Sequence, residues 1–383
     1  MKTVGIICEY NPFHLGHKKQ FDIIRRTLGE DTAIVCLMSG NFVQRGAPAI
    51  FDKSLRAKAA ILSGADLVLE LPVTYALSSA EGFAAGGVRI LSGFCDYLCF
   101  GCESGTEDSL TDTAKALLSS DFPEKLRNQL DKGLSFPAAR QAALGEQGDL
   151  LKSPNDILGV EYCKAILSQG SLMKPLPIHR EGSYHDVTAD SENPSATAVR
   201  NLIAGGHDWK SYIPVAAQSA FEGAAVHTLA AGERAILARL RSMTDEEFAA
   251  LPYGSEGLWR KCMHACRSCA SLEDIITATK SKRYTRTRLD RMVMCAYLGI
   301  TKEQLESPAP YTRVLALNDA GKALLKKART EGSFPHVGEA VDDPYWLLEQ
   351  RTSDLYGLFR EDTPSPAGQE QNRRVYIASK KAP

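Results

Sequence analysis

Two histidines near the N-terminus, His14 and His17, have the residue type and spacing that point most clearly to chemistry. They lie in the stretch EYNPFHLGHKK, directly after the apolar run TVGIIC. Two imidazoles three residues apart face the same side of a first helical turn, and Gly16 between them leaves room for close backbone approach. A helix N-terminus adds unpaired N–H groups and a positive dipole end, which favour a bound phosphate. The pattern therefore favours a phosphate-binding site.

A metal site and simple packing are the two other interpretations of this histidine pair. A zinc site needs a third and a fourth ligand, and the stretch has neither a Glu between the histidines nor a nearby Cys or His at zinc spacing. Packing against the first helix would be preferred for an arbitrary HxxH pattern. The preceding strand and the Asn-Pro-Phe turn favour the phosphate site here, and we expect no metal.

Two cysteine-rich stretches have the spacing of metal motifs. CDYLCFGC has the CxxxCxxC spacing of iron–sulfur sites, but it reads as a strand, which sends alternate side chains to opposite faces. CMHACRSC has helical periodicity and lacks paired CxxC knuckles. We therefore expect core positions rather than a metal site at Cys95, Cys99, Cys102, Cys262, His264, Cys266 and Cys269.

The elements that must position the histidines alternate between short apolar runs and helical patterns over residues 1–110. This rhythm predicts an α/β fold with a parallel sheet covered by helices. Four predicted strands end in the polar loops EYNPFHLGH, SGNFVQRGAP, ELPVTYALSSAE and GCESGTED. Ligands of such folds bind at the carboxyl ends of the strands, so we expect the four loops to converge on one rim.

The rest of the chain predicts two further regions. Helical patterns and a returning strand, LMKPLPIHR, extend the α/β domain to about residue 205. Amphipathic helices follow and predict a second, mostly helical domain over residues 206–345. Residues 346–383 are rich in polar residues, Pro and Gly, and we interpret them as a loose, partly disordered tail.

Composition sets the broad class. The 383 residues are 44% hydrophobic, enough for two globular domains, and their formal net charge of -1 means that any nucleic-acid surface must be local. The N-terminal apolar run is too short for a signal peptide, and no stretch is long enough for a membrane span. With ten scattered cysteines, we expect a cytoplasmic protein with free thiols.

Strand-x-NPFHLGH resembles the HxGH signature of nucleotidylyltransferases, the relatives of class I aminoacyl-tRNA synthetases. Together with LMSGNFVQRGAPA, ADLVLELP, FGCESG, SPNDILGVEY and PSATAVR, it is similar to one family, the bacterial tRNA(Met) cytidine acetate ligases. The resemblance covers the α/β domain and continues into KRYTRTRLDR. It implies a Rossmann-like nucleotidylyltransferase domain that activates acetate with ATP, then transfers acetyl to N4 of the wobble cytidine of elongator tRNA(Met).

The resemblance also implies which residues bind ATP, and we expect Mg²⁺ as the helper ion. They are His14 and His17, which we expect to be catalytic, and their neighbours Ile7, Cys8, Glu9, Tyr10, Asn11, Pro12, Phe13, Leu15, Gly16, Lys18, Lys19 and Gln20, with the more distant Gly101, Asn155 and Arg180. Gly101 ends an apolar run and can let a nucleoside lie against bare backbone. From sequence alone, Asn155 could equally be a helix cap.

Other residues are candidates for the phosphate, acetate or RNA. NPSATAVR resembles a second phosphate motif, whose donors would be Ser195, Thr197 and Arg200, although Ala196 departs from the commoner serine pair. The loop SGNFVQRG could hold acetate or tRNA through Asn41, Gln44 and Arg45. The charge run in KSKRYTRTRLDR could bind tRNA phosphates, with one aromatic ring to stack on a base, through Lys280, Lys282, Arg283, Tyr284, Arg286, Arg288 and Arg291.

Two alternatives belong to other functional classes. One is a small-molecule nucleotidylyltransferase of coenzyme biosynthesis, which seldom needs so large a helical domain. The other is a nucleotide-binding module without catalysis, against which the paired histidines argue. For the basic stretch, a solvated helix start is the usual interpretation of a charge run of this size. The tRNA substrate that the resemblance implies needs phosphate contacts and shifts the balance towards tRNA binding.

Overall fold

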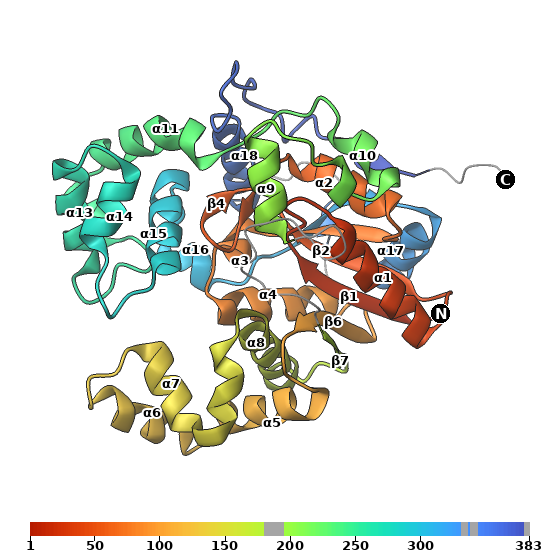
Figure 1. Cartoon of the computed structure of the whole chain (residues 1–383), viewed down its shortest axis with the longest axis horizontal. Coiled ribbons are helices and arrows are strands. Elements are labelled where there is room, and N and C mark those ends of the chain that lie inside the picture. The colour runs from red at the N-terminus through yellow and green to blue at the C-terminus, as the bar shows by residue number, and fades with distance from the viewer. Residues whose placement is uncertain (180–194, 331–335, 338–343, 379–383) are drawn as a thin grey trace.

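The computed structural model describes residues 1–179, 195–330, 336–337 and 344–378. Within them the chain forms one mixed sheet with helices on both faces and a helical lobe beside it (Figure 1). This arrangement confirms the predicted α/β class. In spatial order the strands are β10 (Tyr376–Ile377), β8 (Thr312–Leu317), β5 (Leu67–Leu71), β2 (Ala33–Ser39), β1 (Thr3–Cys8), β6 (Tyr97–Cys102) and β7 (Lys174–His179), while β9 (His336–Val337) pairs with β8.

Five neighbouring strands, β5, β2, β1, β6 and β7, run parallel, so their carboxyl ends share one edge. The β1–β2 register runs from Thr3 opposite Ala33 to Cys8 opposite Met38. β8 pairs antiparallel with β5 and comes from residues that the sequence placed in the helical domain. The sheet is therefore completed by a distant segment whose six residues between helical patterns gave no strand signal of their own.

Period-two alternation in β2 divides the core of the sheet into two layers. Ile34, Cys36 and Met38 belong to one buried cluster, and Val35 and Leu37 belong to the other. The first layer contains α1 (Leu15–Leu28), α2 (Lys53–Leu62), α9 (Ala196–Ala204) and α10 (Val215–Phe221). The second contains α4 (Ala80–Leu91), α5 (Glu107–Leu118), α8 (Pro154–Ser168) and α17 (Asp319–Thr330).

The helical lobe has its own buried cluster, into which Phe42, Val73 and Leu77 reach from the α/β part. Its helices are α11 (Leu229–Ser242), α12 (Asp245–Ala249), α13 (Leu258–Ser268), α14 (Leu272–Thr279), α15 (Arg286–Leu298) and α18 (Pro344–Tyr356). The shorter elements are β3 (Phe42–Val43), β4 (Ala47–Pro48), α3 (Val73–Ala76), α6 (Phe122–Leu130), α7 (Phe136–Leu144), η1 (Gly145–Lys152), η2 (Lys210–Tyr212) and α16 (Lys302–Glu306).

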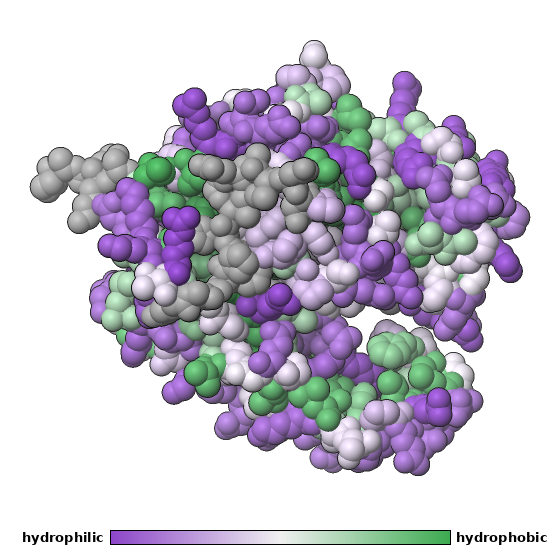
Figure 2. Space-filling model, turned by 180° about the vertical axis from the view of Figure 1, so that it is seen from behind, coloured by the Kyte–Doolittle hydropathy of each residue, from purple (hydrophilic) through white to green (hydrophobic). Residues whose placement is uncertain are grey.

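The α6–α7 extension stands apart from the helical lobe, and a notch separates the two in the space-filling view (Figure 2). Hydrophobic residues gather on this extension, where Leu130, Leu134 and Phe136 are exposed. None of the helices in the described ranges is both long and apolar enough to cross a membrane.

The C-terminal segment differs from the loose tail predicted for residues 346–383. It forms the end of α18, buries Phe359 and Glu370, and adds β10 to the sheet beside β8. Charged residues of this segment pair with buried charged residues of the α/β part. Those partners lie far away in the sequence, so the composition of the segment alone did not predict the contact. Residues 379–383 lie outside the described part of the chain.

Candidate active site

A cavity of about 300 Å³ opens at the carboxyl ends of β1 and β6. It is closed by the β3–β4 hairpin and by the first turns of α8 and α9. A larger hollow of about 670 Å³ lies at the opposite end of the sheet, beside Lys2, Asp96 and Lys174, and none of the predicted site residues lines it. We therefore assign the candidate active site to the smaller cavity, where three of the four predicted loops converge. The fourth loop, ELPVTYALSSAE, does not line it. Of the predicted residues, the cavity is lined by Ile7, Cys8, Glu9, Tyr10, Asn11, His14, His17, Gln20, Gln44, Arg45, Gly101, Asn155, Ser195, Thr197 and Arg200.

The two histidines form the N-terminal cap of α1. His14 is the N-cap residue, and its Nδ1 accepts a hydrogen bond from the backbone N–H of Gly16 at 3.1 Å. Nδ1 of His17 accepts the backbone N–H of His14 at 3.2 Å, which completes a reciprocal capping box. Because both Nδ1 atoms are acceptors, the proton of each neutral ring resides on Nε2. Packing as a cap and donation to a phosphate are therefore compatible roles.

The buried ring of His14 stacks on that of His17, with centroids 3.8 Å apart. The ring of His17 also contacts Tyr10 and Phe13, at centroid distances of 4.8 and 5.5 Å. Rings held on several sides are preorganised, so little rearrangement is needed when charge develops nearby.

Asn11 links the histidine loop to two other segments. Its side-chain oxygen accepts the backbone N–H of Ile50 at 2.8 Å, and its carbonyl accepts a guanidinium N–H of Arg200, also at 2.8 Å. Arg200 donates as well to the hydroxyl of Thr197 at 3.0 Å, while the Ser195 side chain caps α9. Ser195 is therefore a helix cap, and this helix start lies against the histidine loop.

A carboxylate clasp fixes Gly101 and Asn155 on the other side of the cavity. The Asn155 amide donates to Glu103 at 2.7 Å, and the buried Asp156 accepts the backbone N–H groups of Glu103, Ser104 and Gly105. The N-cap of α8 is Ser153, so Asn155 lies one residue inside the helix. The clasp holds the end of β6 against the start of α8.

The β3–β4 hairpin carries two of its three predicted residues to the cavity. The backbone N–H of Gln44 donates to a carboxylate oxygen of Glu9 at 2.9 Å, and the exposed Arg45 also lines the cavity. Asn41 does not line it: its amide donates to Asp52 and its oxygen accepts the N–H of Lys53. Asn41 therefore shapes the base of the hairpin.

Several residues of the predicted ATP segment do not line the cavity, because the helix turns them away. Phe13 is fully buried in the core, and Lys18 pairs with Asp22 one turn along α1. The remaining ones are Pro12, Leu15, Gly16 and Lys19. Arg180 lies outside the described residues.

Sequence reasoning missed Arg56, which supports the site from below. This fully buried guanidinium donates to the carbonyls of Glu9, Ser39, Gly40 and Phe51. These acceptors lie at the ends of β1 and β2 and in the loop before α2, so one side chain fixes the floor of the rim. Arg56 lies in the helical stretch KSLRAKAAIL beside two lysines, so its local sequence did not distinguish it from a solvated charge and did not indicate its partners.

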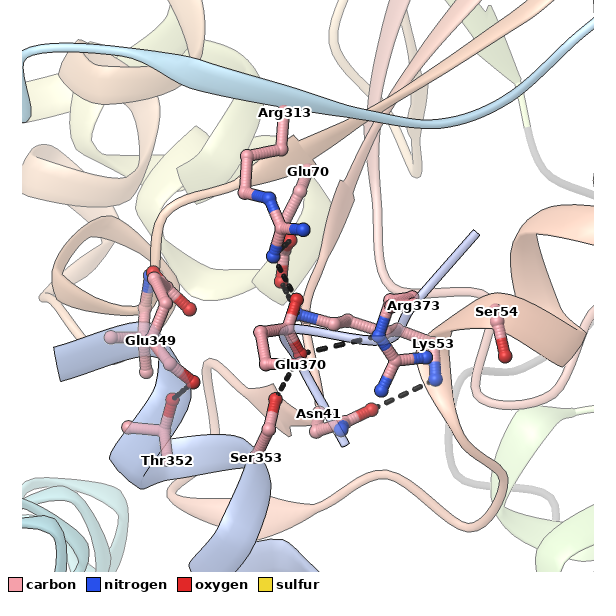
Figure 3. Close-up of polar contacts among 12 residues, drawn as sticks. Asn41, Lys53, Ser54, Glu70, Arg313, Glu349, Thr352, Ser353, Glu370 and Arg373 are labelled. Carbon is pink, nitrogen blue, oxygen red and sulfur yellow. Dashed lines mark hydrogen bonds and ion pairs between the residues drawn. The ribbon is translucent and has the colours of Figure 1, made fainter. Parts of the chain in front are cut away.

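A buried network of charges, also missed, joins the same edge of the sheet to the C-terminal segment (Figure 3). Lys53 pairs with Glu70 at 2.5 Å and with Glu370 at 2.9 Å, and Glu370 also pairs with Arg313 and Arg373. Arg373 reaches on to Asp52 at 2.5 Å. Burial lowers the pKa of Lys53 to about 8. Burial, followed by the charge of Glu70, raises the pKa of the neighbouring Glu349 to about 7.

Four of the seven residues predicted to be core positions, Cys99, Cys102, Cys262 and Cys266, are buried. Cys95 and Cys269 are half-buried and His264 is exposed, because these three lie at the edges of the packed faces. Burial raises the pKa of Cys99 to about 12 and that of Cys102 to about 11. The sulfur atoms of Cys262 and Cys266 lie 3.9 Å apart. Across the described ranges no group of three or more His, Cys, Asp or Glu side chains could hold a metal ion.

Three arginines of the basic stretch 280–291 contact neighbouring segments of the chain. Arg286 makes two hydrogen bonds to Glu273, and Arg288 donates to the carbonyl of Tyr253 and lies 4.9 Å over the ring of Tyr284. Arg291 faces the hairpin, where it donates to the carbonyl of Gln44. Towards solvent the exposed side chains are Lys280, Lys282 and Arg283, the last paired with Glu256.

Known proteins resemble this chain over most of its length. The HIGH Nucleotidyl Transferase family model matches residues 1–372. The tRNA(Met) cytidine acetate ligase of Clostridium novyi is 38% identical, over 88% of this chain and 89% of that protein. That of Acetivibrio thermocellus is 34% identical, over 98% and 100%. A crystal structure of Thermotoga maritima TmcAL bound with alpha-thio ATP superposes with a TM-score of 0.89 at 29% identity, covering 99% of this chain and 100% of that one.

Proposed function

We propose that this chain, which belongs to the tRNA(Met) cytidine acetate ligase family and to the HIGH nucleotidyl transferases, activates acetate with ATP and acetylates N4 of the wobble cytidine of elongator tRNA(Met). The observation that carries the proposal is a single cavity lined by the histidine pair, Gly101, Asn155 and Arg200. A related structure bound with alpha-thio ATP supports nucleotide binding there. The basic helical lobe beside the cavity suits a tRNA substrate.

In the first step an acetate oxygen attacks the α-phosphorus of ATP. A bond forms between that oxygen and phosphorus, the bond to the bridging oxygen breaks, and pyrophosphate leaves with the electron pair. No protein nucleophile is needed. The Nε2–H groups of His14 and His17 would donate to phosphate oxygens as their charge changes in the transition state, and Arg200 would neutralise the leaving pyrophosphate.

In the second step the cytidine N4 attacks the carbonyl carbon of acetyl-adenylate. The new C–N bond replaces the C–O bond to adenylate, AMP leaves with the electron pair, and the amine loses one proton to solvent. The hairpin residues Gln44 and Arg45 are our candidates for holding acetate or the incoming base.

Mg²⁺ would neutralise charge on the triphosphate, and the residues fit an ion bound mainly through its substrate. Glu9 carries the one carboxylate among the described residues that line the cavity. Mg²⁺ usually keeps several waters and binds through one or two carboxylates together with substrate phosphates. Ten free cysteines are consistent with a reducing, cytoplasmic location for this enzyme.

ATP–pyrophosphate exchange, followed by mass spectrometry of tRNA, tests the proposal. We expect exchange that depends on acetate, and N4-acetylcytidine in bulk tRNA only when ATP and acetate are both present. Exchange that depends on a phosphate ester would indicate a small-molecule nucleotidylyltransferase. If no acceptor supports ATP–pyrophosphate exchange, the result would indicate a nucleotide-binding module without catalysis.

A further inference from the structure

The β3–β4 hairpin belongs to two parts of the molecule at once. Phe42 is buried in the core of the helical lobe, where its ring packs edge-on against Tyr356 and Phe359 at centroid distances of 5.9 and 5.8 Å. The next three residues, 43–45, line the nucleotide cavity. A displacement of the helical lobe must therefore move the cavity wall, because close-packed side chains transmit strain.

The turn of the hairpin lies directly on the backbone of α15. Gly46 has a φ of +76°, and a Cβ there would lie 2.5 Å from the carbonyl carbon of Asp290 and 2.6 Å from the nitrogen of Arg291. Only glycine fits such a position, because both the left-handed backbone and the close approach exclude a side chain. The hairpin and the basic helix thus meet backbone to backbone.

Hydrogen bonds from both sides hold the Gln44 backbone. Its N–H donates to Glu9 in the cavity at 2.9 Å, and its carbonyl accepts a guanidinium N–H of Arg291 at 3.4 Å. The Arg291 guanidinium also lies 5.2 Å over the ring of Tyr253, whose hydroxyl donates to the Leu77 carbonyl of the α/β part. Gln44 therefore connects the cavity carboxylate to the helical lobe through one residue.

Stability alone explains Arg291 poorly. Its Nε is buried, and in the described part of the chain it has no hydrogen-bond partner. A buried donor without a partner destabilises the folded state. A guanidinium kept in this place at such a cost is better explained by what it positions.

We propose that Arg291 is a positioning residue for acetate activation: from the helical lobe it holds the hairpin that carries Gln44 and Arg45 against the cavity. This inference rests on the proposed function. Loss of Arg291 impairs the first half-reaction even when no RNA is present.

The test compares Arg291→Ala, Arg291→Lys and the control Arg267→Ala in acetate-dependent exchange without RNA. Arg267 lies on α13 of the same lobe, is exposed and pairs with Asp245, away from the hairpin. We expect Arg291→Ala to raise KM for acetate about ten-fold while kcat changes less than about two-fold, the pattern of lost ground-state positioning. Lysine should restore part of the loss. A KM for Arg291→Ala equal to that of the Arg267→Ala control would overturn the inference.

Amide hydrogen exchange of the same proteins gives a readout that does not depend on the proposed chemistry. We expect faster exchange over residues 42–48 in Arg291→Ala, with the strands of the sheet as slow as in the unaltered protein. If the unaltered protein shows no acetate-dependent ATP–pyrophosphate exchange, the proposed function fails. The rate of amide hydrogen exchange in the hairpin then decides the positioning role by itself. Unchanged protection of the hairpin in Arg291→Ala would contradict that role whatever the substrate.

Discussion

The imidazole rings of His14 and His17 stack with their planes 27° apart, and each ring uses Nδ1 to accept a backbone N–H of the same helical turn. The capping box therefore sets the tautomer of both rings. Their Nε2–H groups are the remaining donors, which is the form that a phosphate oxygen requires.

His14→Asn should separate the cap from the chemistry. Asparagine is a good N-cap and can accept the Gly16 N–H, so we expect the unfolding free energy to change by less than about 1 kcal/mol. The ring Nε2–H is lost, so acetate-dependent exchange should fall by about two orders of magnitude, as it should in His14→Ala and His17→Ala. Full exchange in His14→Asn, with an unchanged circular dichroism spectrum, would leave the histidines a purely structural cap.

Lys280→Glu combined with Lys282→Glu should weaken tRNA binding. Both lysines are exposed, and neither side chain forms a hydrogen bond or ion pair with a residue that the structure describes. Arg286 and Arg288 hold neighbouring segments, so replacing them would also disturb the lobe. Each lost phosphate contact lowers affinity and the salt dependence of binding, so we expect at least a ten-fold rise in Kd in a filter assay. Acetate-dependent ATP–pyrophosphate exchange, measured without RNA, checks that the cavity of the variant is intact. Unaltered tRNA affinity would show that these lysines are only a solvated face.

The buried charge network should make Lys53→Met strongly destabilising. Methionine removes the cation between Glu70 and Glu370, both of which are buried. Breaking a buried ion pair from one side costs about 3–5 kcal/mol when the other charge is left uncompensated. Glu370 keeps Arg313 and Arg373 as partners, so we expect a loss at the lower end of that range. Urea denaturation measures this loss. Lys322→Met, which breaks an exposed pair with Asp319, serves as the control and should cost less than about 1 kcal/mol.

Glu349→Gln should change how stability depends on pH. The pKa of Glu349 is raised to about 7 in the folded protein, above its unfolded value, so between about pH 4.5 and 7 the folded state binds more protons. The contribution of this group is therefore fully present at low pH and is lost as pH rises through 7. We expect Glu349→Gln to remove that decline. The difference in unfolding free energy between pH 5 and pH 8, measured by denaturation, should therefore be smaller in Glu349→Gln than in the unaltered protein. A parallel pH profile in the two proteins would contradict the buried, protonatable carboxyl.

Removal of zinc and iron should leave activity intact. Neither cysteine stretch gathers ligands that could hold a metal in the described structure. We expect chelators specific for these metals, with Mg²⁺ resupplied, to change exchange by less than about two-fold, since the proposed chemistry uses no transition metal. Stoichiometric zinc or iron in elemental analysis would argue otherwise.

The sequence by itself determined the elements whose signals are local. The βα alternation of residues 1–110 predicted β1, β2, β5 and β6, because strand and helix periodicity are carried by neighbouring residues. It also placed the histidine pair, the SGNFVQRGAP loop and the start of the GCESGTED loop at one rim, because parallel strands bring their carboxyl ends to the same edge. The start of α9 was suggested only by its resemblance to a phosphate motif.

Only the tertiary structure decided which distant residues complete that rim. β8, the Glu370–Arg373 segment, Arg56 and the contact of Arg291 with Gln44 join positions 17 to 321 residues apart. A charged residue in isolation signals exposure, and it becomes buried only where a remote partner compensates the cost of desolvation. For that reason a composition typical of a loose tail could fold into the sheet, and half of a basic stretch could turn inward to hold the hairpin.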